Sequence, residues 1–316
     1  MFSPTRTYVT LLSAAFLIAC VARSDPTTTP QAQPTYSWAL DRLDQRSLPL
    51  SKKPFKTKAT GKGVTIYFFD GGIAHHPDLE GRISDTAYAA FPEENGYACN
   101  SHGTAVAGAA AGTSWGVAKQ ARVVDVKIIQ CSSGRGTLEG VALAAEWVIQ
   151  RHEKTGGPSV VNWSFSVDTG KTVPLMLQVV GMLHNAGITV VIAAGNWDMD
   201  ACRISPANAP GAIVVGSSTL KDEKAPLSAW GDCITVYAPG DSVPLPTVLY
   251  GVDTVIPWWG TSMSAGYVSG AAALYLETHP KARADDVYAY IHSQASPIIK
   301  TAYGNFGRLL FLNPRY

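Results

Sequence analysis

The chain has 316 residues, of which 46% are hydrophobic, and its formal net charge is +1. This length can bury a large core and suits one large α/β domain or two small ones, of which we expect one. The near-zero charge and the lack of a basic block argue against nucleic acid or a polyanionic surface as the main partner.

The first twenty residues are typical of an export signal. Arg6 precedes an apolar run at 8–19, which is too short to span a membrane comfortably and ends in small residues. The sequence LIAC at 17–20 resembles the bacterial lipoprotein box, in which the cysteine is acylated and becomes the first mature residue. Lipid on Cys20 would hold the protein at a bilayer. The alternative is an ordinary cleaved signal peptide over 1–20 with an incidental cysteine.

A flexible tether is predicted at 21–37. Residues 24–37 consist mostly of Pro, Thr, Gln and Ser, with almost nothing to bury, which is typical of an extended linker. The folded domain is expected to start at Trp38 and to continue to residue 316, because no internal repeat or second low-complexity stretch follows.

The fold class follows from five short apolar runs rich in β-branched residues, at 63–70, 121–129, 159–165, 187–196 and 212–218. Apolarity without alternation predicts strands covered on both faces, as in a parallel sheet. Helix-compatible stretches lie between them at 102–112, 138–154 and 173–187. This alternation predicts a doubly wound α/β fold, with a mainly parallel sheet, helices on both faces and a functional crevice at the carboxyl ends of the strands.

Four residues are candidates for nucleophilic catalysis. A serine hydroxyl needs a base to take its proton and a third group that orients the base. FFDGG ends a predicted strand in Asp70, while SHGTAVAG and GTSMSAG place His102 and Ser262 at the starts of small-residue helices. A helix start aims backbone N–H groups at the charge that develops in acyl transfer. The amide of Asn196, after the strand ending in AAGN, can donate to the same oxyanion.

Each of these residues also has an ordinary structural interpretation. Ser262 can cap its helix, Asp70 and Asn196 can be turn residues, and His102 can be a buried structural histidine. Taken singly, each structural interpretation is favoured, but together they require four coincidences. The G-x-S-x-G motif of another hydrolase fold fails, because position 264 is Ser and the histidine precedes the serine.

Together, the four segments resemble the subtilisin family of serine proteases, most closely its proteinase K and aqualysin branch. The resemblance runs from WALDRLDQRSLPLS at 38–51 to GNFGRLL at 304–310, so it implies a subtilisin-like peptidase domain over 38–316. It implies that Ser262 attacks the scissile carbonyl and that His102 acts as general base and then general acid. Asp70 would fix the imidazole tautomer, and Asn196 with the Ser262 N–H would stabilise the oxyanion.

Beyond Cys20 there are four cysteines, an even number that predicts disulfides in an exported chain and leaves three pairings open. Their placement is similar to that in aqualysin-type enzymes, which implies the pairs Cys99–Cys131 and Cys202–Cys233. Free buried thiols are the alternative.

The resemblance also implies that an extended peptide adds as a strand between two segments of the enzyme. The residues so implied are Ser133, Gly134 and Arg135 on one side, Ser164, Phe165 and Ser166 on the other, and Ala194 and Gly195 with Ala193 as a pocket wall. Relatives usually have Ser-Leu-Gly-Gly where this chain has SFSV at 164–167. We therefore expect a large aromatic side chain to fit less readily here.

No cofactor is expected for the chemistry, and no catalytic metal. Structural calcium is conventional in the family, at a site that would use the carbonyls of Pro210 and Ala212 and an Asp where this chain has Thr235. A neutral hydroxyl is a weak ligand for a hard cation, so this site is expected to be weakened or lost. The adjacent His75 and His76 are interpreted as loop residues.

The sequence as a whole predicts an exported, monomeric serine endopeptidase of broad specificity that acts on peptides or proteins. It would be secreted, or held at a bacterial cell envelope through Cys20. The alternative is a catalytically impaired, protease-like binding protein. Two observations motivate it: the altered binding segment at 164–167, and the short stretch at 21–35 where relatives usually have a long prosegment.

Overall fold

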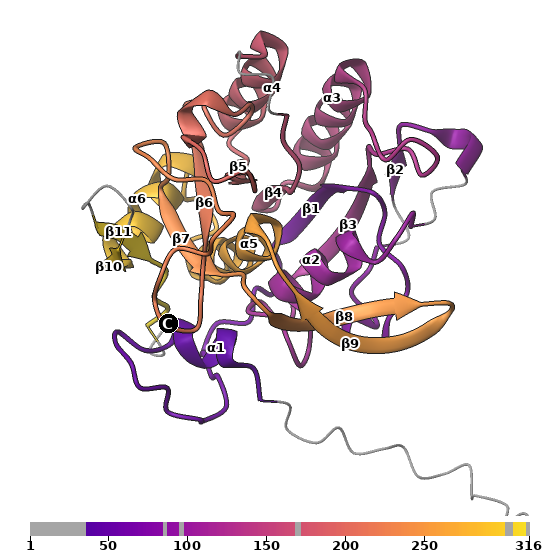
Figure 1. The fold of residues 1–316 in the computed structure, drawn as a ribbon. Coiled ribbons are helices and arrows are strands. Elements are labelled where there is room, and N and C mark those ends of the chain that lie inside the picture. The colour runs from indigo at the N-terminus through magenta and orange to yellow at the C-terminus, as the bar shows by residue number, and fades with distance from the viewer. Residues whose placement is uncertain (1–35, 85–86, 95–97, 168–171, 301–305, 314–316) are drawn as a thin grey trace, which may run out of the picture. The chain divides into compact units, whose positions relative to one another are not determined.

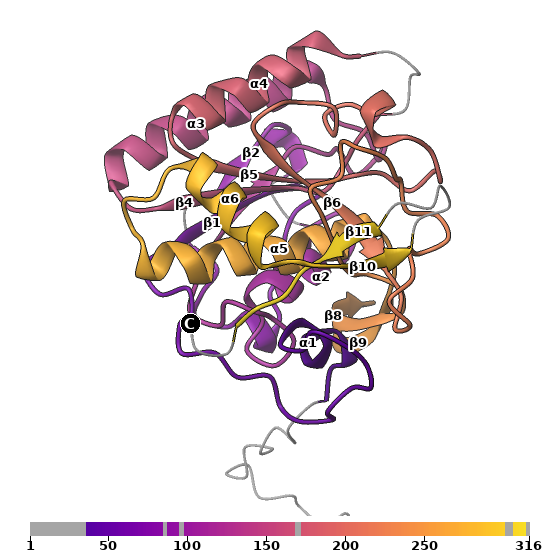
Figure 2. The same cartoon turned by 90° about the vertical axis from the view of Figure 1, so that its left-hand side faces the viewer.

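The computed structural model describes residues 36–84, 87–94, 98–167, 172–300 and 306–313. They form a nine-stranded sheet with helices on both faces (Figures 1 and 2) and a separate two-stranded hairpin. The predicted α/β fold is thus confirmed. Within these ranges, no helix combines the length and the apolarity that crossing a membrane requires. The predicted export signal, Cys20 and nearly all of the predicted tether lie outside the described residues.

The large sheet has the strand order β10-β11-β7-β6-β5-β4-β1-β3-β2, and its pairs are parallel except β10 with β11. All five predicted strands are present, with ends trimmed by a few residues. The bounds are β1 (Thr65–Asp70), β2 (Tyr88–Ala89), β3 (Arg122–Lys127), β4 (Ser159–Trp163), β5 (Thr189–Ala193), β6 (Ala212–Ser218), β7 (Val236–Pro239), β10 (Ser296–Lys300) and β11 (Phe306–Leu309).

Two layers of helices cover the sheet, as Figure 2 shows from the side. One core joins α2, α5 and α6 to the sheet, and a second core joins α3 and α4 to the opposite face. The helices are α1 (Trp38–Leu43), α2 (His102–Ala111), α3 (Leu138–Thr155), α4 (Pro174–Asn185), α5 (Thr261–Thr278) and α6 (Ala284–Gln294), with short 3₁₀ turns at Pro77–Leu79, Pro92–Glu94 and Ala201–Arg203.

Local sequence sets the ends of the helices that flank the site. The α3 helix begins where the hydroxyl of Thr137 accepts from the N–H of Gly140 at 2.9 Å. It ends at Gly156, which adopts the left-handed conformation at φ 67°. The α4 helix starts with Pro174 in its first turn, where a missing N–H costs nothing.

A long hairpin that the sequence analysis did not predict lies beside α2 (Figure 1). It consists of β8 (Val243–Leu249) and β9 (Val252–Trp258), paired antiparallel over seven residues. Ser101 holds it to the start of α2, because its hydroxyl donates to the carbonyl of Val248 at 2.6 Å and accepts from the N–H of Val248 at 2.8 Å. The hairpin is therefore fixed directly beside His102.

Two disulfides form within the described residues, Cys99–Cys131 and Cys202–Cys233. These are the two pairs that the family resemblance implies among the three pairings left open by the sequence. The first ties the segment before α2 to the segment after β3, at the carboxyl edge of the sheet.

Candidate active site

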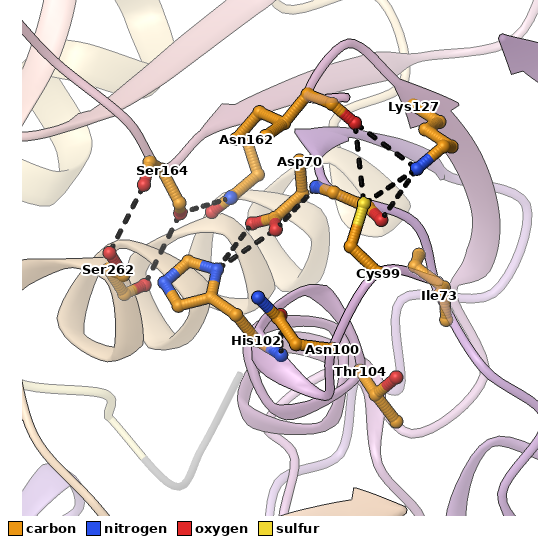
Figure 3. Close-up of polar contacts among 12 residues, drawn as sticks. Asp70, Ile73, Cys99, Asn100, His102, Thr104, Lys127, Asn162, Ser164 and Ser262 are labelled. Carbon is orange, nitrogen blue, oxygen red and sulfur yellow. Dashed lines mark hydrogen bonds and ion pairs between the residues drawn. The ribbon is translucent and has the colours of Figure 1, made fainter. Parts of the chain in front are cut away.

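Asp70 and His102 form a hydrogen-bonded pair at the carboxyl edge of the sheet (Figure 3). Asp70 is the last residue of β1, as predicted, and His102 is the first residue of α2. Nδ1 of His102 lies 2.9 Å from each carboxylate oxygen of Asp70, whose side chain is 2% exposed. A carboxylate only accepts hydrogen bonds, so Nδ1 carries the hydrogen and Nε2 is left with a free lone pair. This is the tautomer that a general base needs.

Glycine and threonine next to His102 bring α2 this close to β1. A Cβ at Gly103 would lie 2.4 Å from the carbonyl oxygen of Gly72, so only glycine permits the approach. The hydroxyl of Thr104 accepts from the N–H of Ala74 at 2.9 Å, which joins the helix to the turn after Asp70. The close approach of His102 to Asp70 therefore depends on the Gly103 and Thr104 that follow the histidine.

The pKa of His102 is raised above its ordinary value of 6.5. Burial by itself lowers this pKa, because it disfavours the charged ring, but the charge of Asp70 and the hydrogen bond to it outweigh that effect. Asp70 therefore stabilises the imidazolium that forms whenever the ring takes a proton.

Ser262 is the second residue of α5 and does not cap it, because the cap position is Gly260 at φ 120°. Its hydroxyl donates to the carbonyl of Ser164 at 3.2 Å. Within the described part of the chain, no hydrogen bond joins this hydroxyl to His102. Figure 3 shows the imidazole with Nδ1 toward Asp70 and its opposite edge toward Ser262.

Asn196 lies three residues beyond the end of β5 and contacts the start of α5. Its Oδ1 accepts from the backbone N–H of Thr261 at 2.9 Å and from the Thr261 hydroxyl at 3.1 Å. That hydroxyl accepts in turn from the N–H of Gly195 at 3.2 Å. Because an N–H can only donate, these contacts fix which side of the amide is oxygen and leave Nδ2 as a donor beside Ser262.

A buried polar network that the sequence analysis missed supports Ser164. Nδ2 of Asn162 donates to the Ser164 hydroxyl at 2.7 Å, and the Ser269 hydroxyl donates to Oδ1 of Asn162 at 2.9 Å. All three residues are buried. The sequence signal for this network is Asn162, a polar residue inside the apolar run of β4. Its partner Ser269 likewise lies inside the apolar helix α5.

The residues predicted to bind substrate fall into two groups. Ser164, Phe165 and Ser166 directly follow β4, and Ala194 and Gly195 directly follow β5, so both segments reach the start of α5. In contrast, Ser133, Gly134 and Arg135 lie in an exposed turn closed by hydrogen bonds between Gln130 and Arg135 and between Gly134 and Gln130. Ser164 and Gly195 thus contact the first two residues of α5, whereas Ser133, Gly134 and Arg135 lie in the turn; the binding of substrate by both groups stays a prediction.

A cavity of about 280 Å³ that the sequence analysis did not predict lies beside Asn196. Two of its apolar residues are well exposed, Leu227 at 57% and Trp259 at 69%. The cavity is lined by Asn196, Ser217, Ala225, Pro226, Leu227, Ser228, Gly240, Asp241, Trp259 and Gly260. Its walls come from segments remote in sequence, which explains why no local motif reveals it.

At the usual calcium position, one of the residues already has a hydrogen-bond partner within the fold. The Thr235 hydroxyl oxygen, which would replace a carboxylate ligand, is buried and already accepts from the N–H of Val214 at 3.1 Å. His76 has a structural role: its Nδ1 accepts from the N–H of Asp78, and its Nε2 lies 3.2 Å from the carbonyl of Thr254. Among the described residues, the one group of potential metal ligands includes both sulfurs of the Cys99–Cys131 disulfide.

The comparisons with known proteins agree with this geometry. The sequence profile of the Subtilase family matches residues 61–307. An extracellular serine proteinase of Thermus sp. (strain Rt41A) is 39% identical over 88% of this chain and 66% of its own length. Alkaline serine exoprotease A of Vibrio alginolyticus is 36% identical over 91% of this chain and 52% of its own length.

A crystal structure of a cold adapted subtilisin-like serine proteinase is also similar, with 34% identity and a TM-score of 0.78. The match covers 87% of this chain and 97% of that one. The chain spans about two thirds and about half of the lengths of the two curated relatives above. The profile match covers most of the chain, and both sequence and structure agree with it. This chain belongs to the subtilase family.

Proposed function

We propose that this protein is an exported serine endopeptidase that hydrolyses peptide bonds through an acyl-enzyme on Ser262. The observation that carries the proposal is the pair of the buried Asp70 and the partly exposed His102, with Nδ1 held by the carboxylate and Nε2 left as a base. Ser262 and Asn196 lie at the same edge of the sheet and supply a nucleophile and a hydrogen-bond donor. The names of the two curated relatives describe serine proteases, which supports the same reaction class.

In the first half of the reaction, Nε2 of His102 takes the proton of the Ser262 hydroxyl as Oγ attacks the scissile carbonyl carbon. The carbonyl oxygen becomes an oxyanion, which accepts from Nδ2 of Asn196 and the backbone N–H of Ser262. His102 then gives its proton to the leaving amine, and the acyl-enzyme remains on Oγ. A water molecule then gives a proton to His102 as it attacks the ester, and the acid is released as His102 returns that proton to Oγ of Ser262.

We further propose that substrate binding changes the orientation of the Ser262 hydroxyl. In the free protein this hydroxyl donates to the carbonyl of Ser164, at the end of β4. A peptide that pairs as a strand with segment 164–166 would offer its own N–H to that carbonyl. The peptide would thereby release the hydroxyl to His102, so that the triad assembles when substrate is present.

The proposed substrates are peptides or unfolded proteins of varied sequence, because pairing through main-chain atoms reads little side-chain information. Selectivity would come from Ser166 and Val167, whose side chains occupy positions that are usually glycine, and from the cavity beside Asn196. We further propose that the protein is secreted, or anchored through Cys20, and acts as a monomer. An acylated, detergent-soluble product that disappears in Cys20→Ser would support the anchor.

Hydrolysis of denatured casein tests the proposal, with Ser262→Ala as the matched variant. We expect the wild-type mature chain to cleave casein and Ser262→Ala to lose the activity. The side chains at Ser166 and Val167, where relatives have glycine, favour the alternative of a protease-like binding protein. A wild-type chain that binds casein without cleaving it would support that alternative and contradict the proposed enzyme.

A further inference from the structure

A second buried carboxylate, Asp125, lies behind the catalytic pair. It is 6% exposed and sits in β3, on the face that packs against α2, where its neighbour Val123 belongs to the apolar core. Its Oδ2 accepts from the N–H of Ile73 at 3.0 Å, and its Oδ1 is buried with no partner among the described residues. A buried polar atom without a partner is costly, and an apolar residue would fill this position without that cost. Fold stability therefore does not explain Asp125.

The contacts of Asp125 lead to the catalytic pair. In the sheet, Asp125 is opposite Phe68, two residues before Asp70 in β1. The chain leaves β1 at Asp70 and folds back, so that the N–H of Ile73 reaches Asp125. The next residue, Ala74, donates to Thr104 in the first turn of α2. Asp125 thus fixes one end of the turn that separates Asp70 from the helix carrying His102.

The charge of Asp125 is linked to that of Asp70, the carboxylate that holds His102. Burial raises the pKa of Asp125 to about 7, and Asp70 adds to the rise, whereas the hydrogen bond from Ile73 and the charge of Lys127 oppose it. Of the residues in α2, which packs against the same face of the sheet as Asp125, His102 is the one that titrates. Tyr88 of the adjacent strand β2 also titrates, but it packs on the other face of the sheet. Asp125 is therefore ionised above about pH 7, where its negative charge favours the protonated form of His102.

We propose that Asp125 is a positioning residue of the catalytic site, which anchors the turn after Asp70 and adds a negative charge that stabilises the imidazolium of His102. The proposal rests on the proposed peptidase function for its effect on catalysis, but its effect on His102 is measurable without turnover. It assigns a role to a residue that never touches substrate.

The test is an NMR titration of His102 in the Ser262→Ala chain, which cannot digest itself, compared with the same chain carrying Asp125→Asn. Asparagine keeps the acceptor for Ile73 and removes the charge. We expect the pKa of His102 to fall by about half a unit or more, because an opposite charge nearby raises a histidine pKa. Asp78→Asn is the matched control, since Asp78 is buried, accepts from the N–H of Ser114, and has one unpaired oxygen.

The same substitutions in the chain that keeps Ser262 allow a kinetic test. With Asp125→Asn, the acid limb of kcat/KM should move to lower pH, in step with the NMR shift, while Asp78→Asn leaves both unchanged. Unchanged titration of His102 in Asp125→Asn, or an equal shift in the control, overturns the proposal. A wild-type chain without hydrolysis contradicts the peptidase function alone, because the NMR comparison still decides the role of Asp125.

A direct measurement covers the case in which Asp125→Asn does not fold. In the Ser262→Ala chain, the carboxyl carbon of Asp125 should titrate near pH 7, and the ring of His102 should show an inflection at the same pH. Titration of Asp125 without any response of His102 would overturn the proposed coupling.

Discussion

Replacing Asn196 with alanine should reduce both the rate of catalysis and the stability of the fold. Loss of the Nδ2 donor should lower kcat by about 10² to 10³, or about 2.7 to 4 kcal/mol, the value known for one such donor in subtilisin, a member of the same family. The structure adds a second effect, because Oδ1 also accepts from the backbone and hydroxyl of Thr261. Leaving that backbone N–H unpaired should reduce the free energy of unfolding by about 1 to 3 kcal/mol.

Thr261→Val is the matched variant, because it keeps Nδ2 of Asn196 and removes one hydroxyl that orients the amide, together with the acceptor of the Gly195 N–H. We expect its kcat to fall by no more than about tenfold, with little change in KM. The assay is steady-state kinetics on a chromogenic peptide anilide, with the concentration of active sites and the Tm measured for each variant. The oxyanion role of Asn196 is refuted if Asn196→Ala folds and keeps a kcat within twofold of wild type.

Three further outcomes follow from the contacts. The acid limb of kcat/KM should lie above pH 6.5 and should shift down in Asp70→Asn, because the charge of Asp70 that raises the pKa of His102 against burial is then removed; a wild-type midpoint below 6.5 would contradict this. Replacing the Cys202–Cys233 disulfide by two serines should lower the free energy of unfolding by about 3 to 4 kcal/mol, measured by denaturant titration, since the bond closes a loop of 31 residues. Ser166→Gly should raise kcat/KM several-fold for substrates with a large aromatic residue before the scissile bond but not for alanine, and equal effects on both would exclude a steric role.

The stability contributed by the pair of Asp70 and His102 has a defined pH dependence. The folded protein holds the proton of His102 more tightly than the unfolded chain does, because the pKa is raised. This contribution is complete below about pH 6.5 and is lost as the pH rises through the folded pKa. The same raised pKa keeps part of the ring charged near neutrality, where it cannot act as a base.

Much of the sheet was predictable because its strands are buried on both faces. The run at 212–218 matches β6 residue for residue, and helix α3 ends one residue beyond the predicted stretch at 138–154. The hairpin of β8 and β9 was not predictable from the same signals. Pro244, Pro246 and Pro257 lie within its strands and lack the N–H that a strand interior normally uses, so propensity argues against strands there.

Part of the candidate site was likewise predictable from the sequence, and part was not. Asp70, His102 and Asn196 stand at the ends or starts of strongly patterned elements, so topology alone places them at one edge of the sheet. The rotamer of the Ser262 hydroxyl depends on a carbonyl in another segment, and no sequence pattern carries that information. Asp125 was missed because it lies inside an apolar run and was interpreted as part of a strand.

The most direct test of the central claim is covalent labelling of the wild-type mature chain with a fluorophosphonate probe, followed by mass spectrometry of its peptides. We expect a single modified residue, Ser262, with labelling abolished in Ser262→Ala and strongly slowed when His102 is replaced by alanine. A folded wild-type chain that takes up no probe, or that is labelled equally well without His102, would contradict it.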